Sequence, residues 1–177
     1  SLEQLDKGVA IMKGYSGEGD GGVIDLGCII TLQTDYIPRL LKAYAQSTEH
    51  STEFDISQKP SQELLAGIAE GKHDVVFCAC DDVEGENLEF IPVVEQQLVV
   101  AMNAYCPLAS APFLTIEDLR DKQLITYRGE MPIGKAVKRL LEGHGIENVR
   151  YAYEDESILS GFAAEGPEIA LLLNTFL

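Results

Sequence analysis

The sequence predicts an α/β fold made of two similar halves, each with a mostly parallel sheet. Segments typical of strands and of amphipathic helices alternate from Val23 to Cys80 and again from Gln123 to Leu173. Such alternation is typical of right-handed crossovers between parallel strands. Between the halves, the segment from Leu88 to Met102 is extended and interrupted by Pro92, which a central strand tolerates poorly. We therefore expect two strands joined by a crossing segment there, which would act as a hinge.

Residues 1–21 predict the end of a helix followed by a connector. Apolar residues from Leu2 to Met12 have helical spacing, and glycines then recur from Gly14 to Gly22. We expect this helix to continue a longer element that precedes the chain in the full protein.

The first half predicts alternating strands and helices. The expected strands cover Val23–Ile30, Phe54–Ser57 and His73–Cys80, and the expected helices cover Thr34–Gln46 and Gln62–Glu70. The first strand has one charged residue, which is typical of a strand buried on both faces. The second helix is followed by Gly71, the residue type that most easily ends a helix in the left-handed conformation.

The second half repeats this alternation. The expected strands cover Gln123–Tyr127, Val149–Ala152 and Ile169–Leu173. We expect Thr115 to cap a short helix with Asp118, and Ser157 to cap a helix through Phe162. Between them, an apolar stripe predicts a helix that ends at Gly143 or Gly145, with the stripe formed by Ile133, Val137, Leu140 and Leu141.

Polar residues at two expected helix starts indicate a ligand site. Thr31 and Ser61 each stand between a strand and an amphipathic helix, so both helices would open toward one edge of a sheet. Free backbone amides and capping hydroxyls at such positions bind anions or polar ligands. The pattern therefore predicts that the chain holds a small molecule.

Composition and charge exclude several classes of function. The formal net charge is −16, spread along the chain, so the surface would repel a phosphate backbone and the chain alone should not bind DNA. No apolar run is long enough to span a bilayer, and the first residues lack a signal-peptide pattern. We expect a cytoplasmic protein without membrane contact.

The four cysteines do not form a disulfide framework. Cys28, Cys78, Cys80 and Cys106 are irregularly spaced in a chain of 177 residues, so we expect reduced, mostly buried thiols. A redox-sensing thiol is the alternative. No soft ligands stand near Cys78 and Cys80, so we expect no metal site, and nothing in the sequence indicates a cofactor.

Several motifs together resemble the effector-binding domain of LysR-type transcriptional regulators. The stretch G-C-I-I-T-L-Q-T-D-Y-I-P-R-L-L at Gly27–Leu41 is similar to the family's first strand and helix, and E-L-L-A-G-I-A-E-G-K-H-D at Glu63–Asp74 is similar to its second helix and third strand. Weaker similarity continues at Cys106–Ala109, where the family has His-Pro-Leu-Ala, and at Phe162–Leu172. In that last stretch the chain departs from the family pattern, because Glu165 and Glu168 flank Gly166-Pro167.

The resemblance implies an α/β fold with two Rossmann-like lobes, as in type 2 periplasmic binding proteins, joined by hinge strands. It implies the end of a linker helix and connector at residues 1–21, lobe I at 22–97, and lobe II at 98–177, incomplete at its C-terminus. A small, anionic effector would bind between the lobes. The implied ligand-binding residues are Thr31, Gln33, Ser61, Val99, Thr126, Tyr127 and Arg128.

The resemblance also implies partners. The chain would form a homodimer or homotetramer, with the Thr34–Gln46 helix packing beside the partner's Gln62–Glu70 helix. DNA would be bound only through an N-terminal winged helix-turn-helix domain outside this chain.

An enzyme is the weakest hypothesis, because none of the three histidines stands in a pattern with a nucleophile, and we expect no catalytic residues. A transporter's solute-binding protein shares the fold and is a closer alternative. A thiol redox sensor of the same regulator family is the other alternative.

Overall fold

The computed structural model describes residues 2–15, 22–49, 51–79 and 88–175. The chain forms two compact units, the first spanning Ser1–Glu95 and the second Gln96–Thr175. No helix in the described ranges is long and apolar enough to cross a membrane.

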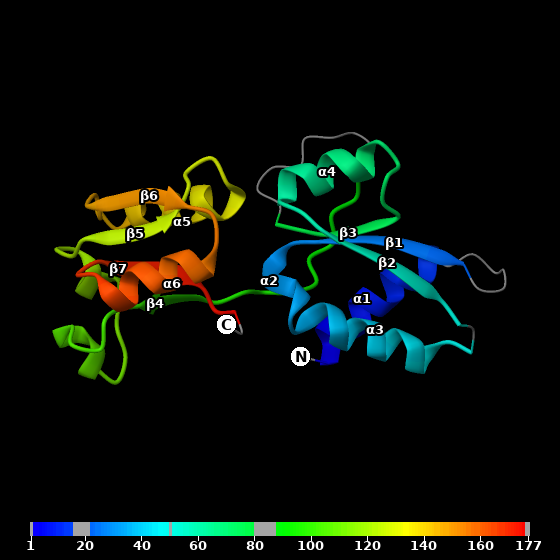
Figure 1. The fold of residues 1–177 in the computed structure, drawn as a ribbon, viewed down its shortest axis with the longest axis horizontal. Helices are drawn as coiled ribbons and strands as arrows, with labels where there is room; N and C mark the ends of the chain where they lie inside the picture. The colour runs from blue at the N-terminus through cyan, green and yellow to red at the C-terminus, as the bar shows by residue number, and fades with distance from the viewer. Residues whose placement is uncertain (1, 16–21, 50, 80–87, 176–177) are drawn as a thin grey trace. The chain divides into compact units, whose positions relative to one another are not determined.

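Unit 1 is a parallel sheet covered on both faces by helices. Its strands are β1 (Val23–Cys28), β2 (Glu53–Gln58) and β3 (Val75–Phe77), in the order β2-β1-β3. Helix α4 (Ser61–Ala69) lies on one face, and α1 (Leu2–Tyr15) and α3 (Tyr36–Ser47) lie on the other (Figure 1). The prediction of a parallel sheet with crossover helices is therefore confirmed.

Apolar residues of α1, α3 and the sheet form the core of unit 1. Met12, Leu26, Leu40 and Tyr44 are each 0–1% exposed and belong to one buried cluster. The apolar spacing in α1 predicted the helix correctly, although its first apolar residue, Leu2, is exposed.

Some element boundaries in unit 1 differ from the prediction. The first helix is divided into a single turn, α2 (Ile30–Gln33), and α3, because Thr34 and Asp35 form a turn between them. Strand β3 ends at Phe77, so it is shorter than expected, and Cys80 lies outside the described residues. The connector at residues 16–21 also lies outside them.

The segment from Leu88 to Met102 contains one strand where two were predicted. Among the described residues 88–102, only β4 (Leu98–Ala101) pairs with another strand. Val93 and Val94 instead pack against the core of unit 1. Their apolar character, which suggested a strand, is explained by this packing.

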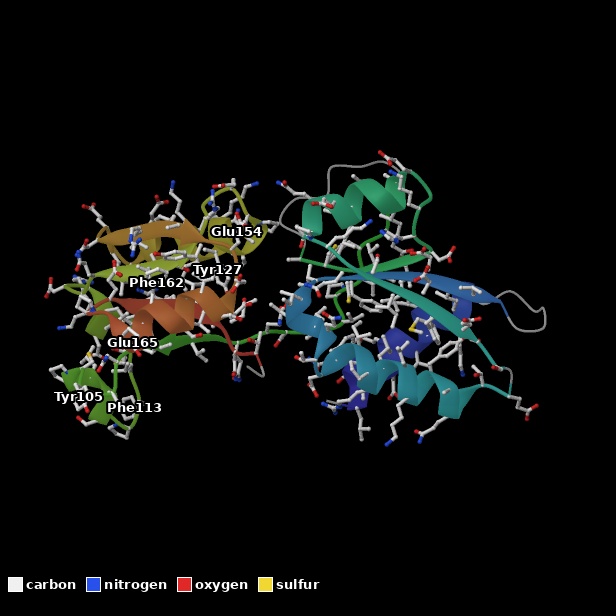
Figure 2. All side chains as sticks on the ribbon, in the orientation of Figure 1. Tyr105, Phe113, Tyr127, Glu154, Phe162 and Glu165 are labelled. Atoms are coloured by element: carbon white, nitrogen blue, oxygen red, sulfur yellow. The ribbon has the colours of Figure 1, made fainter. Side chains whose placement is uncertain are left out.

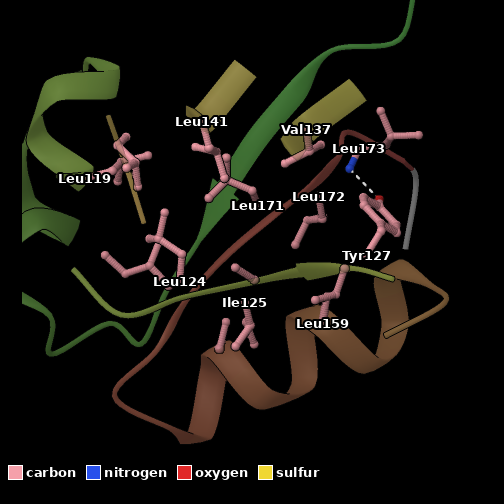
Figure 3. Close-up of a cluster of buried hydrophobic side chains, with 14 residues drawn as sticks. Leu119, Leu124, Ile125, Tyr127, Val137, Leu141, Leu159, Leu171, Leu172 and Leu173 are labelled. Atoms are coloured by element: carbon pink, nitrogen blue, oxygen red, sulfur yellow. Dashed lines mark hydrogen bonds between the residues drawn. The ribbon is translucent and has the colours of Figure 1, made fainter. Parts of the chain in front are cut away.

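Unit 2 has a mixed sheet in the order β4-β7-β5-β6. Strand β5 (Leu124–Tyr127) is parallel to β6 (Val149–Tyr153) and to β7 (Ile169–Leu173), whereas β4 is antiparallel to β7. Helix α5 (Pro132–Gly143) contributes Val137 and Leu141 to the core from one side of β5, and α6 (Glu156–Glu165) contributes Leu159 from the other (Figure 3). The predicted elements of this half are all present.

One of the two helix caps predicted in unit 2 is present, and the other is not. The Thr115 amide and hydroxyl both donate to the Asp118 carboxylate at 2.8 Å, so the predicted capping pair at the 3-10 turn of Ile116–Leu119 is confirmed. The predicted Ser157 cap is wrong, because Asp155 accepts the Ile158 amide at 2.9 Å and starts α6 earlier.

Two glycines end helices as their residue type suggests, whereas the apolar stripe of α5 differs from the prediction. Gly71 and Gly145 have φ of 72° and 68°, and each follows the C-cap of a helix, as the left-handed C-terminal position requires. Leu140, which was predicted to lie on the buried stripe of α5, is instead 41% exposed. The stripe is therefore narrower than its apolar spacing suggested.

Candidate functional site at the carboxyl ends of the parallel strands

In unit 1, the segments that follow all three strands meet at the carboxyl edge of the sheet. The Ile29 amide, after β1, donates to the Phe77 carbonyl of β3 at 3.1 Å. The Lys59 amide, after β2, donates to the Cys28 carbonyl of β1 at 3.2 Å. Because α2 follows β1 and α4 follows β2, both helices begin at this edge, as the sequence predicted. In parallel α/β sheets this is the edge where ligands bind.

Ser61 is the first residue of α4 and is buried. Its expected role as the helix cap is wrong, since the cap position is Pro60. The Ser61 hydroxyl instead accepts the Ala79 amide at 3.2 Å, which joins α4 to the segment after β3. Among the residues that the structure describes, no side chain caps the first-turn amides of α4.

Thr31 and Gln33 lie within the single turn α2. The cap position is Ile29, so Thr31 lies two residues further into the helix than the cap position predicted for it. Thr31 is half-buried and Gln33 is exposed. Both stand at the same sheet edge as Ser61, in the segment directly after β1.

In unit 2, the predicted residues of β5 are fully buried. The Thr126 hydroxyl donates to the Leu171 carbonyl of β7 at 2.9 Å, and the side chain is 0% exposed. Val99 is half-buried and pairs with Leu172 in the β4–β7 ladder. Thr126 and Val99 thus both contact β7, from its two neighbouring strands.

Tyr127 ends β5 and joins two other elements. Its hydroxyl donates to the carboxylate of Glu156. It also accepts the Leu173 amide at 2.8 Å, and Figure 3 shows this second bond. Burial, with the hydrogen bond to Glu156 as a second cause, raises the pKa of Tyr127 far above its usual range. The phenol therefore remains protonated and able to donate.

Arg128 follows β5 and is half-exposed. Its Nε lies 3.1 Å from Oε1 of Glu154, and its Nη1 lies 3.9 Å from Oε1 of Glu130. Glu154 follows β6, and Figure 2 shows it at the same end of the unit as Tyr127. Arg128, the cation expected to bind the ligand, therefore forms ion pairs with two carboxylates.

Backbone contacts hold Arg128 in place. Its amide donates to the Tyr153 carbonyl at 2.8 Å, and its carbonyl accepts the Met131 amide at 3.1 Å. Gly134, in the first turn of α5, lies directly against the same carbonyl, where a Cβ atom would clash with backbone. The position of Arg128 is therefore fixed by close packing of α5.

The sequence did not reveal Ala79, Glu154 or Glu156 as neighbours of the predicted residues. Glu156 is separated from Tyr127 by 29 positions, and Ala79 from Ser61 by 18, so no local pattern joins either pair. The acidic run Glu154-Asp155-Glu156 before an apolar helix was the available signal. Acidic residues at a helix start are favoured by its dipole, which gives such a run an ordinary explanation.

The described residues do not form a metal site. No group of three or more His, Cys, Asp or Glu side chains within them has the arrangement of a metal site. Cys28, Cys78 and Cys106 form no disulfide with one another, and burial raises the pKa of Cys28, which disfavours its reactive thiolate.

Known proteins resemble this chain over most of its length. The HTH-type transcriptional regulator YybE of Bacillus subtilis (strain 168), described as uncharacterized, is 27% identical over 155 residues. The match covers 86% of this chain and 52% of that relative, so the chain spans about half the length of the regulator.

Solved structures show the same fold. The effector-binding domain of QuiR in complex with shikimate superposes with a TM-score of 0.78 at 23% identity, covering 88% of this chain and 75% of that one. HinK, a LysR family transcriptional regulator from Pseudomonas aeruginosa, gives a TM-score of 0.75 at 21% identity, covering 99% and 60%. The BenM effector-binding domain with its effector benzoate gives 0.74 at 19%, covering 88% and 71%.

The predicted architecture and the sequence resemblance are therefore both confirmed. The family model described as the LysR substrate binding domain matches residues 17–176, and by this match the chain belongs to the LysR substrate-binding domain family.

Proposed function

We propose that this chain is the ligand-sensing part of a LysR-type, DNA-binding transcriptional regulator. A small anionic metabolite binds between lobe I, residues 22–97, and lobe II, residues 98–177. The observation that carries the proposal is the family match over residues 17–176. It is supported by relatives described with shikimate, benzoate and 2-PG bound, the first two of which are carboxylates.

The carboxyl edge of unit 1 suits the anionic group of such a ligand. No side chain of the described residues caps the amides at the start of α4, and Ser61 and Thr31 stand beside the segments that meet there. Free amides at a helix start carry partial positive charge and bind carboxylates. Thr31, Gln33 and Ser61 are therefore the proposed ligand residues of lobe I.

Lobe II would contribute the half-exposed guanidinium of Arg128, next to residues whose positions are held by buried hydrogen bonds. Arg128 can exchange the Glu154 carboxylate for that of a ligand, because exposed ion pairs are weak. Thr126, Tyr127 and Val99 would act beside it, with the hydroxyls of Thr126 and Tyr127 holding β5 against β7.

The ligand would act through its difference in affinity between two arrangements of the lobes. No bond is made or broken in this scheme, and the protein works as a sensor in the cytoplasm. The chain would form a homodimer or homotetramer in which α3 packs beside α4 of the partner. DNA would be bound by an N-terminal winged helix-turn-helix domain of the full protein.

The proposal is tested by calorimetry with a panel of carboxylates that includes shikimate and benzoate, selected first by thermal shift. We expect at least one carboxylate to bind, and the double variant Thr31→Ala, Ser61→Ala to bind it more weakly while remaining folded. Ser110→Ala is the matched control, since its exposed hydroxyl donates to the nearby Pro107 carbonyl. Equal affinity in the double variant and the control would remove Thr31 and Ser61 from the site.

A further inference from the structure

A buried polar contact in unit 2 joins the ends of three elements. Tyr127 ends β5, Glu156 begins α6 and Leu173 ends β7. The Tyr127 hydroxyl donates to Glu156 and accepts the Leu173 amide at 2.8 Å, and Figure 3 shows the second bond.

This contact lies in the interior of the unit. Tyr127 is 1% exposed, Glu156 is 4% exposed and Leu173 is 8% exposed. A buried carboxylate is costly unless it is hydrogen-bonded or paired with a cation. None of the ion pairs among the described residues includes Glu156, so the Tyr127 hydroxyl and the start of α6 are what stabilise it.

Leu173 stands beside the place where the chain enters unit 2. It pairs with Leu98 in the β4–β7 ladder, and the next amide, that of Asn174, donates to the Gln97 carbonyl at 2.7 Å. Unit 2 begins at Gln96. A side chain that fixes Leu173 therefore also fixes the first residues of unit 2.

We propose that Tyr127 and Glu156 are a positioning pair that couples the carboxyl edge of unit 2 to the segment Gln96–Leu98. The proposal rests on the proposed function, because that edge, with Arg128 next to Tyr127, is the lobe II part of the ligand site. A ligand that displaces the end of β5 shifts the Tyr127 hydroxyl. The shift passes to Leu173 and then, through the strand pair, to the residues that connect the units.

The competing explanation is a purely local role, in which the pair only satisfies buried polar groups. The two explanations predict different sets of amides whose hydrogen exchange changes when the Tyr127 hydroxyl is removed. A local role predicts a change at Leu173 alone, whereas coupling predicts a change at both Leu173 and Gln96–Leu98.

Hydrogen exchange of the ligand-free chain tests this directly. In Tyr127→Phe the Leu173 amide loses its acceptor, and we expect exchange about tenfold faster at Leu173 and also at residues 96–98. Glu156→Gln keeps an acceptor for the Tyr127 hydroxyl but removes the charge, and we expect a smaller change of the same pattern. This second variant carries the test if Tyr127→Phe does not fold.

Two matched control variants show whether the change in exchange at residues 96–98 is specific to the Tyr127–Glu156 pair. Tyr151→Phe removes a hydroxyl from the neighbouring strand β6, and Glu165→Gln removes a carboxylate from the far end of α6 (Figure 2). Both should exchange like the wild type at residues 96–98. Faster exchange at Leu173 with unchanged exchange at 96–98 would overturn the proposal.

This experiment needs no ligand. Its failure would therefore leave the proposed sensing function intact, and a failed carboxylate screen would leave the exchange result unaffected.

Discussion

Gly134 in α5 packs so closely against the carbonyl oxygen of Arg128 that a Cβ atom there would overlap the backbone. This contact sets how α5 sits on the loop that follows β5, and therefore where the Arg128 side chain begins. The loop is held from the other side by the bond from the Arg128 amide to the Tyr153 carbonyl.

Gly134→Ala is expected to destabilise the chain by about 1–3 kcal/mol, because backbone must move to admit the methyl group. Gly161→Ala in α6 is the control, since nothing lies within 4 Å of the added Cβ. That change should be neutral or stabilising by up to about 1 kcal/mol, because alanine favours helix. Urea unfolding of both variants measures the difference, and equal stability would contradict the close packing.

Asp155→Ala is expected to destabilise the chain by about 1 kcal/mol, because the Ile158 amide loses its capping acceptor. Ser157→Ala, at the position that the sequence suggested as the cap, should change stability by less than about 0.5 kcal/mol. Thermal unfolding of the two variants decides between the two registers of α6. A larger loss in Ser157→Ala would place the helix start where the sequence suggested.

Glu154→Gln is expected to tighten carboxylate binding, because the variant leaves Arg128 with a weaker competing partner. Exposed ion pairs contribute about 0.2–1 kcal/mol, so the gain should be up to about fivefold in the dissociation constant. Calorimetry at low and high salt checks this, with Glu165→Gln as the control for charge alone. Equal gains in both variants would assign the effect to the net charge of the surface.

The Asp118 carboxyl should titrate below its ordinary pKa of 3.8, because it accepts the Thr115 amide and, as a smaller cause, the Thr115 hydroxyl. With a lowered pKa in the folded state, its contribution to stability is present above the unfolded value and is lost as pH falls through the folded value. Carbon-detected NMR titration measures the pKa. Thr115→Ala, which removes only the hydroxyl, should raise it part of the way back.

The sequence was sufficient for features that depend on neighbouring residues. Hydrophobic periodicity located the strands of both sheets, and Gly71 marked the end of α4 because its left-handed conformation is a local requirement. The capping pair of Thr115 and Asp118 is also local, since three positions separate the two residues.

Features that depend on distant residues could not be predicted. Val93 and Val94 are apolar because they pack against the core of unit 1, and this apolar character suggested a strand that does not form. The contact between Tyr127 and Glu156 joins positions far apart in the chain. The Ser61 hydroxyl was expected to cap a helix, but Ala79 is its partner, because the fold brings the end of β3 beside α4. Such pairs are decided by topology and close packing, which a single sequence does not display.

The proposed function requires that one carboxylate ligand contact both the carboxyl edge of the sheet in unit 1 and the carboxyl end of β5 in unit 2. Amide NMR spectra of the wild-type chain, titrated with the carboxylate that raises its melting temperature most, test it directly. The account predicts saturable shifts both at residues 29–33 and 61–63 and at residues 126–128, with the same dissociation constant. Shifts confined to one unit, or found away from both edges, would contradict it.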